Sequence, residues 1–189
     1  MSGKIRIIGG QWRGRRLTVP DRAGLRPSGD RVRETLFNWL QPVIRGSRCL
    51  DLFAGTGALG LEALSRGAAE AVFVERDREL AASLETRLAQ WPGGERGEVA
   101  QADALRWLGI DHRSFDLVFV DPPFDRSLQL RVLDLLSAGP RLSPGARVYL
   151  ELPSRDVEPD PGTPFVVLRN KCLGGVRLML LGYGEAAAL

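Results

Sequence analysis

The sequence has few of the residues from which disulfide frameworks, metal sites and many acid–base catalysts are built. Its 189 residues include two cysteines, Cys49 and Cys172, and a single histidine, His112. The cysteines give neither a disulfide framework nor the spacing of a metal site, so we expect both to be small buried side chains in a reducing cytosol. His112 lies in a polar stretch, where a solvated side chain is more common than a catalytic base. We therefore predict a protein without a metal.

Long hydrophobic runs are also absent. No stretch of about eighteen consecutive apolar residues occurs, which is the length that a membrane-spanning helix needs. No charged and then apolar leader opens the chain either, so we expect a cytoplasmic protein with no membrane partner. With 44% hydrophobic residues the chain can bury one substantial core, and one compact unit is the natural expectation.

Lysine is nearly missing, since arginine supplies 24 of the 26 basic residues. The charges are unevenly distributed. Residues 1–48 hold eleven basic and three acidic residues, a net charge of +8, whereas the remainder holds fifteen and twenty, a net charge of −5. The planar guanidinium group suits phosphates and guanine edges better than an ammonium group does. An acidic body with a basic front end predicts that the front end meets the phosphates of a nucleic acid.

The sequence Asp121-Pro122-Pro123-Phe124 specifies both a site and a chemistry. It follows the apolar run 115–120, which is typical of a buried parallel strand, so the motif should lie at the carboxyl end of that strand, where open α/β sheets bind ligands. The prolines make the backbone rigid and leave its carbonyl groups free to accept hydrogen bonds. A carboxylate before them and an aromatic ring after them form a slot for a planar group that carries an NH₂, such as a nucleobase. We predict that all four residues are catalytic.

A second motif lies upstream, where Asp51 belongs to a predicted strand and Gly55-x-Gly57-x-x-Gly60 follows it. The glycines match a dinucleotide fingerprint and indicate that a ligand approaches the backbone at the beginning of a helix. A pyrophosphate would be repelled by a carboxylate at this place, whereas the cationic amino-acid end of S-adenosylmethionine would be attracted to it. The motif therefore favours S-adenosylmethionine over NAD as the cofactor.

Further carboxylates end the next two predicted strands. Glu75 is placed to accept hydrogen bonds from both ribose hydroxyls, as acidic residues do in dinucleotide folds, and Asp103 could accept from the adenine amino group. Asp77 is expected to cap the following helix instead. The predicted cofactor-binding residues are Asp51, Phe53, Gly55, Gly57, Glu75, Asp103 and Asp121.

Residues 4–19 alternate around a pair of glycines and predict a β-hairpin that carries several arginines and Trp12. Basic side chains with an aromatic ring among them can grip an RNA backbone and stack on an unpaired base. The alternative is that Trp12 packs on the main domain.

A helix should follow the hairpin, capped by Ser28 or Asp30 and extending through Leu40. For Arg31 and Arg33 on this helix, RNA contact, hydrogen bonding on the cofactor side and a solvated helix face all stay open. The predicted RNA-binding residues are Arg6, Trp12, Arg13, Arg15, Arg16, Arg26, Arg31, Arg33 and Lys171.

From residue 48 onward predicted strands and helices alternate, which implies an α/β fold with a parallel sheet and right-handed crossovers. We expect strands at 48–53, 70–75, 97–102, 115–120, 146–152, 164–169 and 175–182 and helices near 57–66, 78–90 and 128–137.

The N-terminal residues add a resemblance to a known family. The segments 5–17 (IRIIGGQWRGRRL) and 25–40 (LRPSGDRVRETLFNWL), followed in order by the glycine turn and Asp-Pro-Pro-Phe, are similar to the signatures of the RsmD family, the bacterial small-subunit rRNA guanine-N2 methyltransferases. Beyond Phe124 the similarity thins to the strand pattern and the tail 171–175. Where the family usually has a threonine pair after Arg-Pro, this chain has Ser28-Gly29 and keeps one of the two hydroxyl groups.

The resemblance implies a Rossmann-like class I methyltransferase that depends on S-adenosylmethionine, with a seven-stranded, mostly parallel sheet whose last strands form an antiparallel hairpin. It implies a basic hairpin and helix extension for RNA recognition over residues 1–44 and a methyltransferase domain over 45–185. The expected reaction is methyl transfer to the exocyclic N2 of a specific guanine in 16S rRNA. The expected partner is the small ribosomal subunit, and we expect a monomer.

Two other classes of function stay open on the residues alone. Asp-Pro-Pro-Phe chemistry serves several amino groups, so the substrate could be adenine N6 in DNA or a base of a different RNA. The glycine turn alone also permits a nucleotide-dependent oxidoreductase or a binding module without catalysis.

Overall fold

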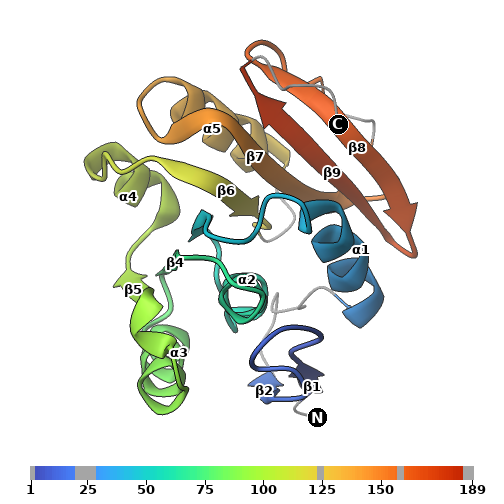
Figure 1. The fold of residues 1–189 in the computed structure, drawn as a ribbon. Helices are drawn as coiled ribbons and strands as arrows, with labels where there is room; N and C mark the ends of the chain where they lie inside the picture. The colour runs from blue at the N-terminus through green and yellow to red at the C-terminus, as the bar shows by residue number, and fades with distance from the viewer. Residues whose placement is uncertain (1–2, 20–28, 123–125, 157–159, 185–189) are drawn as a thin grey trace.

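The computed structural model describes residues 3–19, 29–122, 126–156 and 160–184, which form one large and one small β-sheet with helices around them (Figure 1). The large sheet has seven strands in the order β5-β4-β3-β6-β7-β9-β8. These are β3 (Arg48–Asp51), β4 (Glu70–Glu75), β5 (Gly97–Gln101), β6 (Phe115–Val120), β7 (Leu142–Pro153), β8 (Phe165–Leu173) and β9 (Val176–Tyr183). The small sheet is the predicted N-terminal hairpin, β1 (Gly3–Arg6) and β2 (Arg16–Val19), in antiparallel register.

The order of the parallel strands reverses once in the large sheet. From β3 the chain adds β4 and β5 on one side, in parallel, and then begins again with β6 on the other side of β3. β7 is parallel to β6, and β9 lies antiparallel between β7 and β8. The predicted seven-stranded, mostly parallel sheet with a final antiparallel hairpin is confirmed. In open sheets of this kind ligands bind outside the carboxyl ends of the strands, where the order reverses, which is here between β3 and β6.

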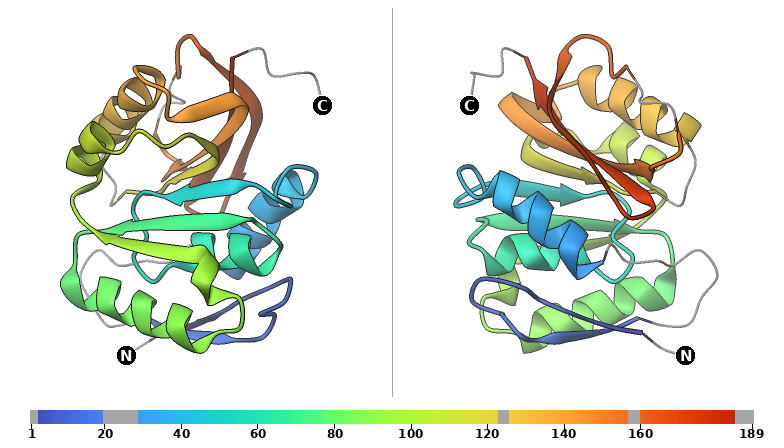
Figure 2. Two further views of the ribbon diagram at one scale, coloured as in Figure 1. Left: turned by 60° about the vertical axis from the view of Figure 1, so that its left-hand side comes forward. Right: turned by 90° about the vertical axis from the view of Figure 1, so that its right-hand side faces the viewer.

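Helices cover both faces of the large sheet (Figure 2). α1 (Asp30–Leu40), α2 (Ala58–Ser65) and α3 (Arg78–Gln90) pack on one face, and α4 (Ala104–Ile110) and α5 (Arg126–Ser137) on the other. A short 3-10 turn, η1 (Gly94–Arg96), precedes β5. Because neighbouring side chains of a strand point to opposite faces, Cys49 packs among α1–α3 and Leu50 among α4 and α5. Burial on both faces explains why the central strands have continuous apolar sequences.

The bounds of some elements differ from the prediction. β7 begins at Leu142 instead of residue 146, and β8 continues to Leu173 instead of 169. β8 is an edge strand whose residues are mostly exposed, so no hydrophobic pattern marks its length. Helix α4 was not predicted, although Ala104, Trp107 and Leu108 are its buried residues at helical spacing.

The described part of the first 44 residues shares the hydrophobic core of the rest of the chain. Ile7, Trp12 and Leu17 of the hairpin region and Phe37 of α1 are buried in the same hydrophobic cluster as side chains of α2 and α3. The predicted boundary at residue 44 therefore separates a predicted RNA-recognition segment from a predicted methyltransferase domain. It does not separate two hydrophobic cores. Among the described residues, no helix has the length and the apolar content that crossing a bilayer requires.

Candidate active site

Four of the predicted acidic residues lie at the same edge of the large sheet. Asp51 and Glu75 are the last residues of β3 and β4, Asp103 follows β5 by two residues, and Asp121 directly follows β6. The four strands are neighbours in the sheet and run parallel, so their carboxyl ends share one edge. The fold thus gathers carboxylates that are separated by up to seventy positions in the sequence.

Two of these carboxylates also hold the glycine turn between β3 and α2. The backbone N–H of Gly55 donates to Glu75 Oε2 at 2.7 Å, and the N–H of Gly60 donates to Asp51 Oδ2 at 2.9 Å. Gly55 and Gly57 have φ angles of 54° and 78°, a left-handed conformation that residues with a side chain rarely adopt. The turn that a ligand would approach is therefore fixed by the acids that end β3 and β4.

Gly60, the third glycine of the fingerprint, has a packing role. A Cβ atom at this position would lie 2.3 Å from Cε1 of Phe73 on β4. Helix α2 can lie this close to the sheet only because position 60 has no side chain, which is the role of the third glycine in dinucleotide-binding turns. The glycine fingerprint thus indicates the geometry of the turn and the helix. The neighbouring acids are what distinguishes one cofactor from another.

Asp51 is buried, and this burial raises its pKa to about 7. The hydrogen bond from Gly60 lowers the pKa by a smaller amount, and the negative charge of Glu75 raises it further. A carboxylate whose ionisation is held back in this way gains its charge most readily when a cation lies beside it. A strongly shifted pKa at the ligand-binding edge of a sheet is typical of a functional group.

The other predicted cofactor residues lie at the same edge with different local roles. Asp103 is exposed and caps α4, because its side chain accepts the N–H of Arg106 at 3.1 Å. A carboxylate has further lone pairs, so capping does not prevent a ligand contact. Phe53 is partly buried and packs against the hydrophobic cluster on the side of α4 and α5. The expectation that Asp77 caps a helix is confirmed, since its side chain accepts two backbone N–H groups at the start of α3.

The Asp-Pro-Pro-Phe motif begins directly after β6. Asp121 is partly buried and Pro122 is buried, and β6 lies beside β3 with Phe119 opposite Asp51 in register. Pro123 and Phe124 are outside the described residues, so their catalytic roles stay predictions. Two carboxylates therefore end neighbouring strands at the place where the strand order reverses.

The prediction that Trp12 stacks on RNA is wrong. Its side chain is 1% exposed, its Nε1–H donates to the carbonyl of Pro92 at 2.9 Å, and its ring packs edge-on against Trp91 with the ring centroids 5.0 Å apart. An indole ring is stabilised by such burial when its N–H finds an acceptor, as here. Trp12 therefore anchors the hairpin to the segment that follows α3.

The prediction that Arg33 contacts RNA is also wrong. Its side chain is completely buried, and its guanidinium group donates to the carbonyl of Arg6 at 2.9 Å and to Asp30 at 2.6 Å. A second buried charge, Glu62, lies 3.5 Å from it. A charge that is removed from water must be paired, and the partners of Arg33 belong to the protein. Arg33 ties α1 to the hairpin.

The sequence analysis missed Glu62, which holds the hairpin on α2. Its completely buried carboxylate accepts the backbone N–H groups of Ile8 and Gly9, both at 2.8 Å, and the Nε–H of Arg66 at 2.7 Å. The loop of the hairpin is therefore bound to the C-terminal part of α2, the helix that follows the glycine turn. An acid within the otherwise apolar segment 58–64 was the available signal in the sequence.

Apart from Arg26, the remaining predicted RNA-binding residues lie on the hairpin, on α1 and on β8. Arg6, Arg13, Arg16, Arg31 and Lys171 are exposed, Arg15 is half-buried with its guanidinium group over the ring of Trp91, and Arg26 lies outside the described residues. Helix α1 lies between the β1–β2 hairpin and the β8–β9 hairpin in the views of Figures 1 and 2. A basic surface can therefore extend over this side of the molecule.

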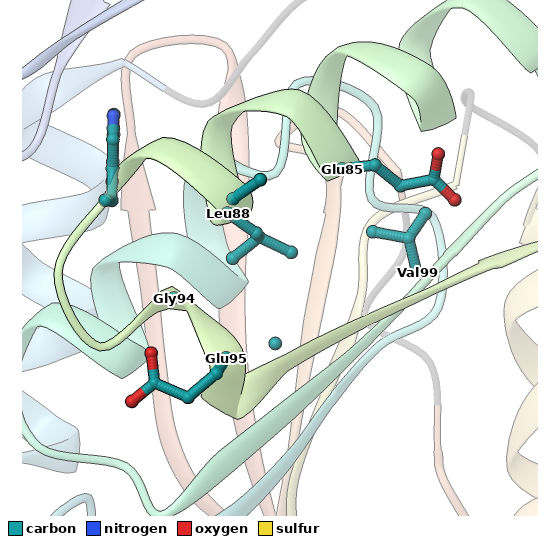
Figure 3. A pocket seen from close by; sticks show the side chains of 8 residues that line it. Glu85, Leu88, Gly94, Glu95 and Val99 are labelled. Carbon is teal, nitrogen blue, oxygen red and sulfur yellow. The ribbon is translucent and has the colours of Figure 1, made fainter.

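A hollow of about 330 Å³ lies away from the acidic edge, between α3, η1 and β5 (Figure 3). Glu85, Leu88, Trp91 and Val99 are among its lining residues, and none of the predicted site residues lines it. It includes Gly97, the first residue of β5, and so lies toward the amino end of that strand. Within the part of the chain that the structure describes, no three His, Cys, Asp or Glu side chains are gathered as a metal ion would require.

Comparison with known proteins gives consistent relatives over nearly the whole chain. The family described as conserved hypothetical protein 95 matches residues 5–182. Ribosomal RNA small subunit methyltransferase D of Escherichia coli (strain K12) is 48% identical over 179 residues, which cover 95% of this chain and 90% of that protein. The protein of the same name from Haemophilus influenzae is 47% identical over 152 residues, which cover 79% of each chain.

Solved structures agree with these relatives. The putative methyltransferase yhhF from Escherichia coli has a TM-score of 0.88 at 44% identity, over 97% of this chain and 99% of that chain. An RNA methyltransferase from Salinibacter ruber, solved in complex with S-adenosyl-L-homocysteine, has a TM-score of 0.67 at 18% identity, over 85% of this chain and 95% of that chain. The second likeness, at this low identity, shows the shared fold.

Proposed function

Since the chain belongs to the family described as conserved hypothetical protein 95, we propose that it is a ribosomal RNA small subunit methyltransferase, which transfers a methyl group from S-adenosylmethionine to N2 of one guanine in 16S rRNA. The observation that carries this proposal is the placement of Asp51 and Asp121 at the ends of neighbouring strands, where the strand order reverses. One carboxylate suits a cationic cofactor, and the other suits an amine. Because the proposed substrate belongs to the assembling ribosome, we expect the enzyme in the cytoplasm.

The residues at the carboxyl edge fit S-adenosylmethionine. Asp51 would attract its cationic amino-acid end, the turn at Gly55 and Gly57 lets the ligand approach the backbone, and Glu75 and Asp103 offer acceptors to the ribose hydroxyls and the adenine amino group. A set of acceptors suits a cation with several donors and opposes a pyrophosphate. When bound, S-adenosylmethionine supplies an electrophilic methyl group, whose bond to sulfur breaks with both electrons passing to sulfur. Asp51 and Glu75 are fixed by their bonds to the glycine turn, so the ligand meets a prepared site.

The raised pKa of Asp51 predicts that cofactor affinity depends on pH. We expect the affinity for S-adenosylmethionine to fall about tenfold between pH 7 and pH 5.5, because a group with a pKa of about 7 loses most of its charge over that range. The α-amino group of the ligand stays protonated below pH 7, so its own titration contributes little. Isothermal titration calorimetry of wild type and Asp51→Asn measures this, and the variant should bind weakly with little pH dependence. Equal slopes in the two proteins would contradict the assignment.

The same pKa has a consequence for stability. Because the pKa of Asp51 is higher in the folded protein than in the unfolded chain, the folded state binds more protons between about pH 4 and pH 7. The contribution of Asp51 to the free energy of unfolding is therefore greatest at the acidic end of this window and is lost as the pH rises through it. Ionisation of the buried Asp51 thus lowers the stability of the folded protein. The attraction between its charge and a cationic ligand can offset this loss.

Asp121 and the carbonyl of Pro122 activate the amine that receives the methyl group. The lone pair of an exocyclic amine is delocalised into the ring, which makes the nitrogen a weak nucleophile. Acceptors that take hydrogen bonds from the NH₂ localise the lone pair and stabilise the positive charge that develops as the N–C bond forms. The nitrogen then releases one proton, and the Asp121 carboxylate is the acceptor beside it. Neither a metal nor a strong base is needed, because alignment of the two reactants is the main requirement.

The basic hairpin and α1 supply the RNA-binding surface. Their exposed arginines can neutralise phosphates, and the anchors at Trp12 and Glu62 keep this surface fixed relative to the site. We expect the double variant Arg13→Gln/Arg16→Gln to raise the KM for ribosomal subunits about tenfold and to lower the salt dependence of binding by about two phosphate contacts. The affinity for S-adenosylmethionine should not change.

Arg106 and Arg131 provide a matched control for this variant. Both are exposed and lie on α4 and α5, which cover the opposite face of the sheet. The double variant Arg106→Gln/Arg131→Gln removes the same charge and should leave the KM nearly unchanged. If both double variants raise the KM equally, total charge and not this surface recruits the RNA.

The experiment that tests the function uses labelled S-adenosylmethionine and small ribosomal subunits from a strain that lacks the cognate gene. After transfer the rRNA is digested to nucleosides, and the expected product is N2-methylguanosine at one site. Label in N6-methyladenine of DNA, or in another RNA with no label in the subunits, would replace the proposed substrate. Oxidation of NADH with no methyl transfer would overturn the reaction itself.

A further inference from the structure

A second buried acid, Glu151, lies beside Asp121 and has no role in the transfer described so far. It is on β7 and is 5% exposed. Its Oε2 accepts the hydroxyl of the buried Tyr149 at 2.9 Å, and its backbone carbonyl accepts the side-chain amide of Gln129 on α5. Both the backbone and the side chain of Glu151 are therefore held in place, which is a property of a group that must meet a ligand in one position.

The strand register places Glu151 next to Asp121. β6 and β7 are parallel, with Phe119 opposite Tyr149, and two residues further along each strand are Asp121 and Glu151. Neighbouring strands lie about 4.8 Å apart, and residues two apart on a strand share a face. Burial raises the pKa of Tyr149, and the negative charges of Glu151 and Asp121 raise it further. The charges of both carboxylates therefore raise the pKa of the same hydroxyl group.

Two adjacent carboxylates suit one base better than the others. Adenine, cytosine and guanine each carry an exocyclic amine. Only in guanine is the amine flanked by a ring N–H on the pairing edge, whereas adenine and cytosine have a ring nitrogen acceptor there. An ionised carboxylate accepts hydrogen bonds and cannot donate them. A second carboxylate beside the amine site therefore matches two neighbouring donors and repels the lone pair of an adenine or a cytosine.

We propose that Glu151 is a specificity-determining residue, which accepts a hydrogen bond from N1–H of the target guanine while Asp121 accepts from the N2 amine. This inference rests on the proposed function and supplies a physical reason for guanine. Tyr149 acts as a positioning residue, because its hydroxyl group donates to Oε2 and holds the carboxylate in one orientation. Adenine in the same pocket would leave buried polar groups unpaired, and sites of that type reject an analogue strongly.

The test compares guanine with 2-aminopurine at the target position, in small subunits reconstituted with ligated 16S rRNA. 2-Aminopurine keeps the N2 amine and has an acceptor at N1 in place of the N–H. We expect wild type to prefer guanine by about 100-fold in kcat/KM, because the analogue both loses a charged hydrogen bond and meets a repelling acceptor. The variant Glu151→Gln, whose amide can donate as well as accept, should prefer guanine by less than about fivefold. Its affinity for S-adenosylmethionine should equal that of wild type.

Tyr149→Phe tests the positioning role, since it removes the hydroxyl group that holds Oε2 and keeps the carboxylate. It should lower the preference for guanine, but by less than Glu151→Gln does. Equal rates on the two bases in wild type would overturn the inference, as would a loss in Glu151→Gln that is the same for both bases. If Glu151→Gln does not fold, Glu151→Asp, which withdraws the carboxylate by one methylene, must lose the preference instead. Wild type that makes no N2-methylguanosine on natural subunits would overturn the proposed function, and that result is distinct from either of these.

Discussion

Replacing Asp121 with alanine is expected to lower kcat for methyl transfer by about a hundredfold to a thousandfold, since removal of one preorganised partner of the transition state typically has an effect of this size. Asp121 directly follows β6 at the reversal of strand order and is the side-chain acceptor proposed for the amine. The affinity for S-adenosylmethionine should change by no more than a few-fold, because Asp51, Glu75 and the glycine turn remain. Transfer to undermethylated small subunits and calorimetric titration of the cofactor measure the two effects separately.

Asp116 offers a control on the same strand. It lies near the amino end of β6, away from the proposed site, where it accepts the backbone N–H of Arg48 at 2.8 Å and pairs with its guanidinium group at the surface. Asp116→Ala removes an acid from β6 without touching the carboxyl edge, so transfer should stay close to wild type. The proposed division of roles fails if Asp121→Ala loses cofactor binding in parallel with activity.

Replacing Glu62 with glutamine is expected to lower the free energy of unfolding by about 3–5 kcal/mol, the usual effect of removing one partner from a buried ion pair. The carboxylate is completely buried, accepts two backbone N–H groups of the hairpin and lies within 3.5 Å of the guanidinium groups of both Arg33 and Arg66. The amide keeps the shape and leaves both cations without their buried counter-charge. For a chain of this size the melting temperature should fall by roughly 10 °C, which thermal and urea unfolding can measure.

Glu98 is the matched control for Glu62. It also pairs with an arginine, Arg113, at 2.6 Å, but its side chain is 56% exposed. Surface ion pairs contribute at most about 1 kcal/mol, so Glu98→Gln should cost far less than Glu62→Gln. Comparable losses in the two variants would show that burial of the network does not determine its contribution. Where Glu62→Gln stays folded, we expect the KM for subunits to rise and the affinity for the cofactor to stay unchanged, because the hairpin loses one of its attachments and the glycine turn loses none.

The acidic site was predictable because it depends on local order. Asp51, Glu75 and Asp121 each come at the end of an apolar run, and parallel strands joined by helices must bring their carboxyl ends to one edge. Hydrophobic periodicity and turn residues were therefore sufficient to predict which acids lie at this edge, although they do not give the distances between them. The same reasoning placed Asp103 at this edge. Its role as the cap of α4 was not predicted, because that helix was not predicted.

The residues that the sequence misassigned are buried by contacts with segments that are far away in the chain. Trp12 and Arg33 have the composition of an RNA-binding segment, yet Trp12 packs on Trp91 and Arg33 lies against Glu62. Nothing near these residues in sequence reveals such partners, since a basic or aromatic side chain has the same local pattern whether it faces water or a buried acid.

The sequence by itself determined the α/β order and the set of acids at the carboxyl edge, because these follow from hydrophobic periodicity and from the chirality of crossovers. The tertiary structure alone decided which charges are buried, as in the attachment of the hairpin by Glu62, and which acids are neighbours, as for Glu151 and Asp121. Burial and neighbourhood depend on packing between segments that are distant in the sequence, and that packing is settled only when the whole core forms.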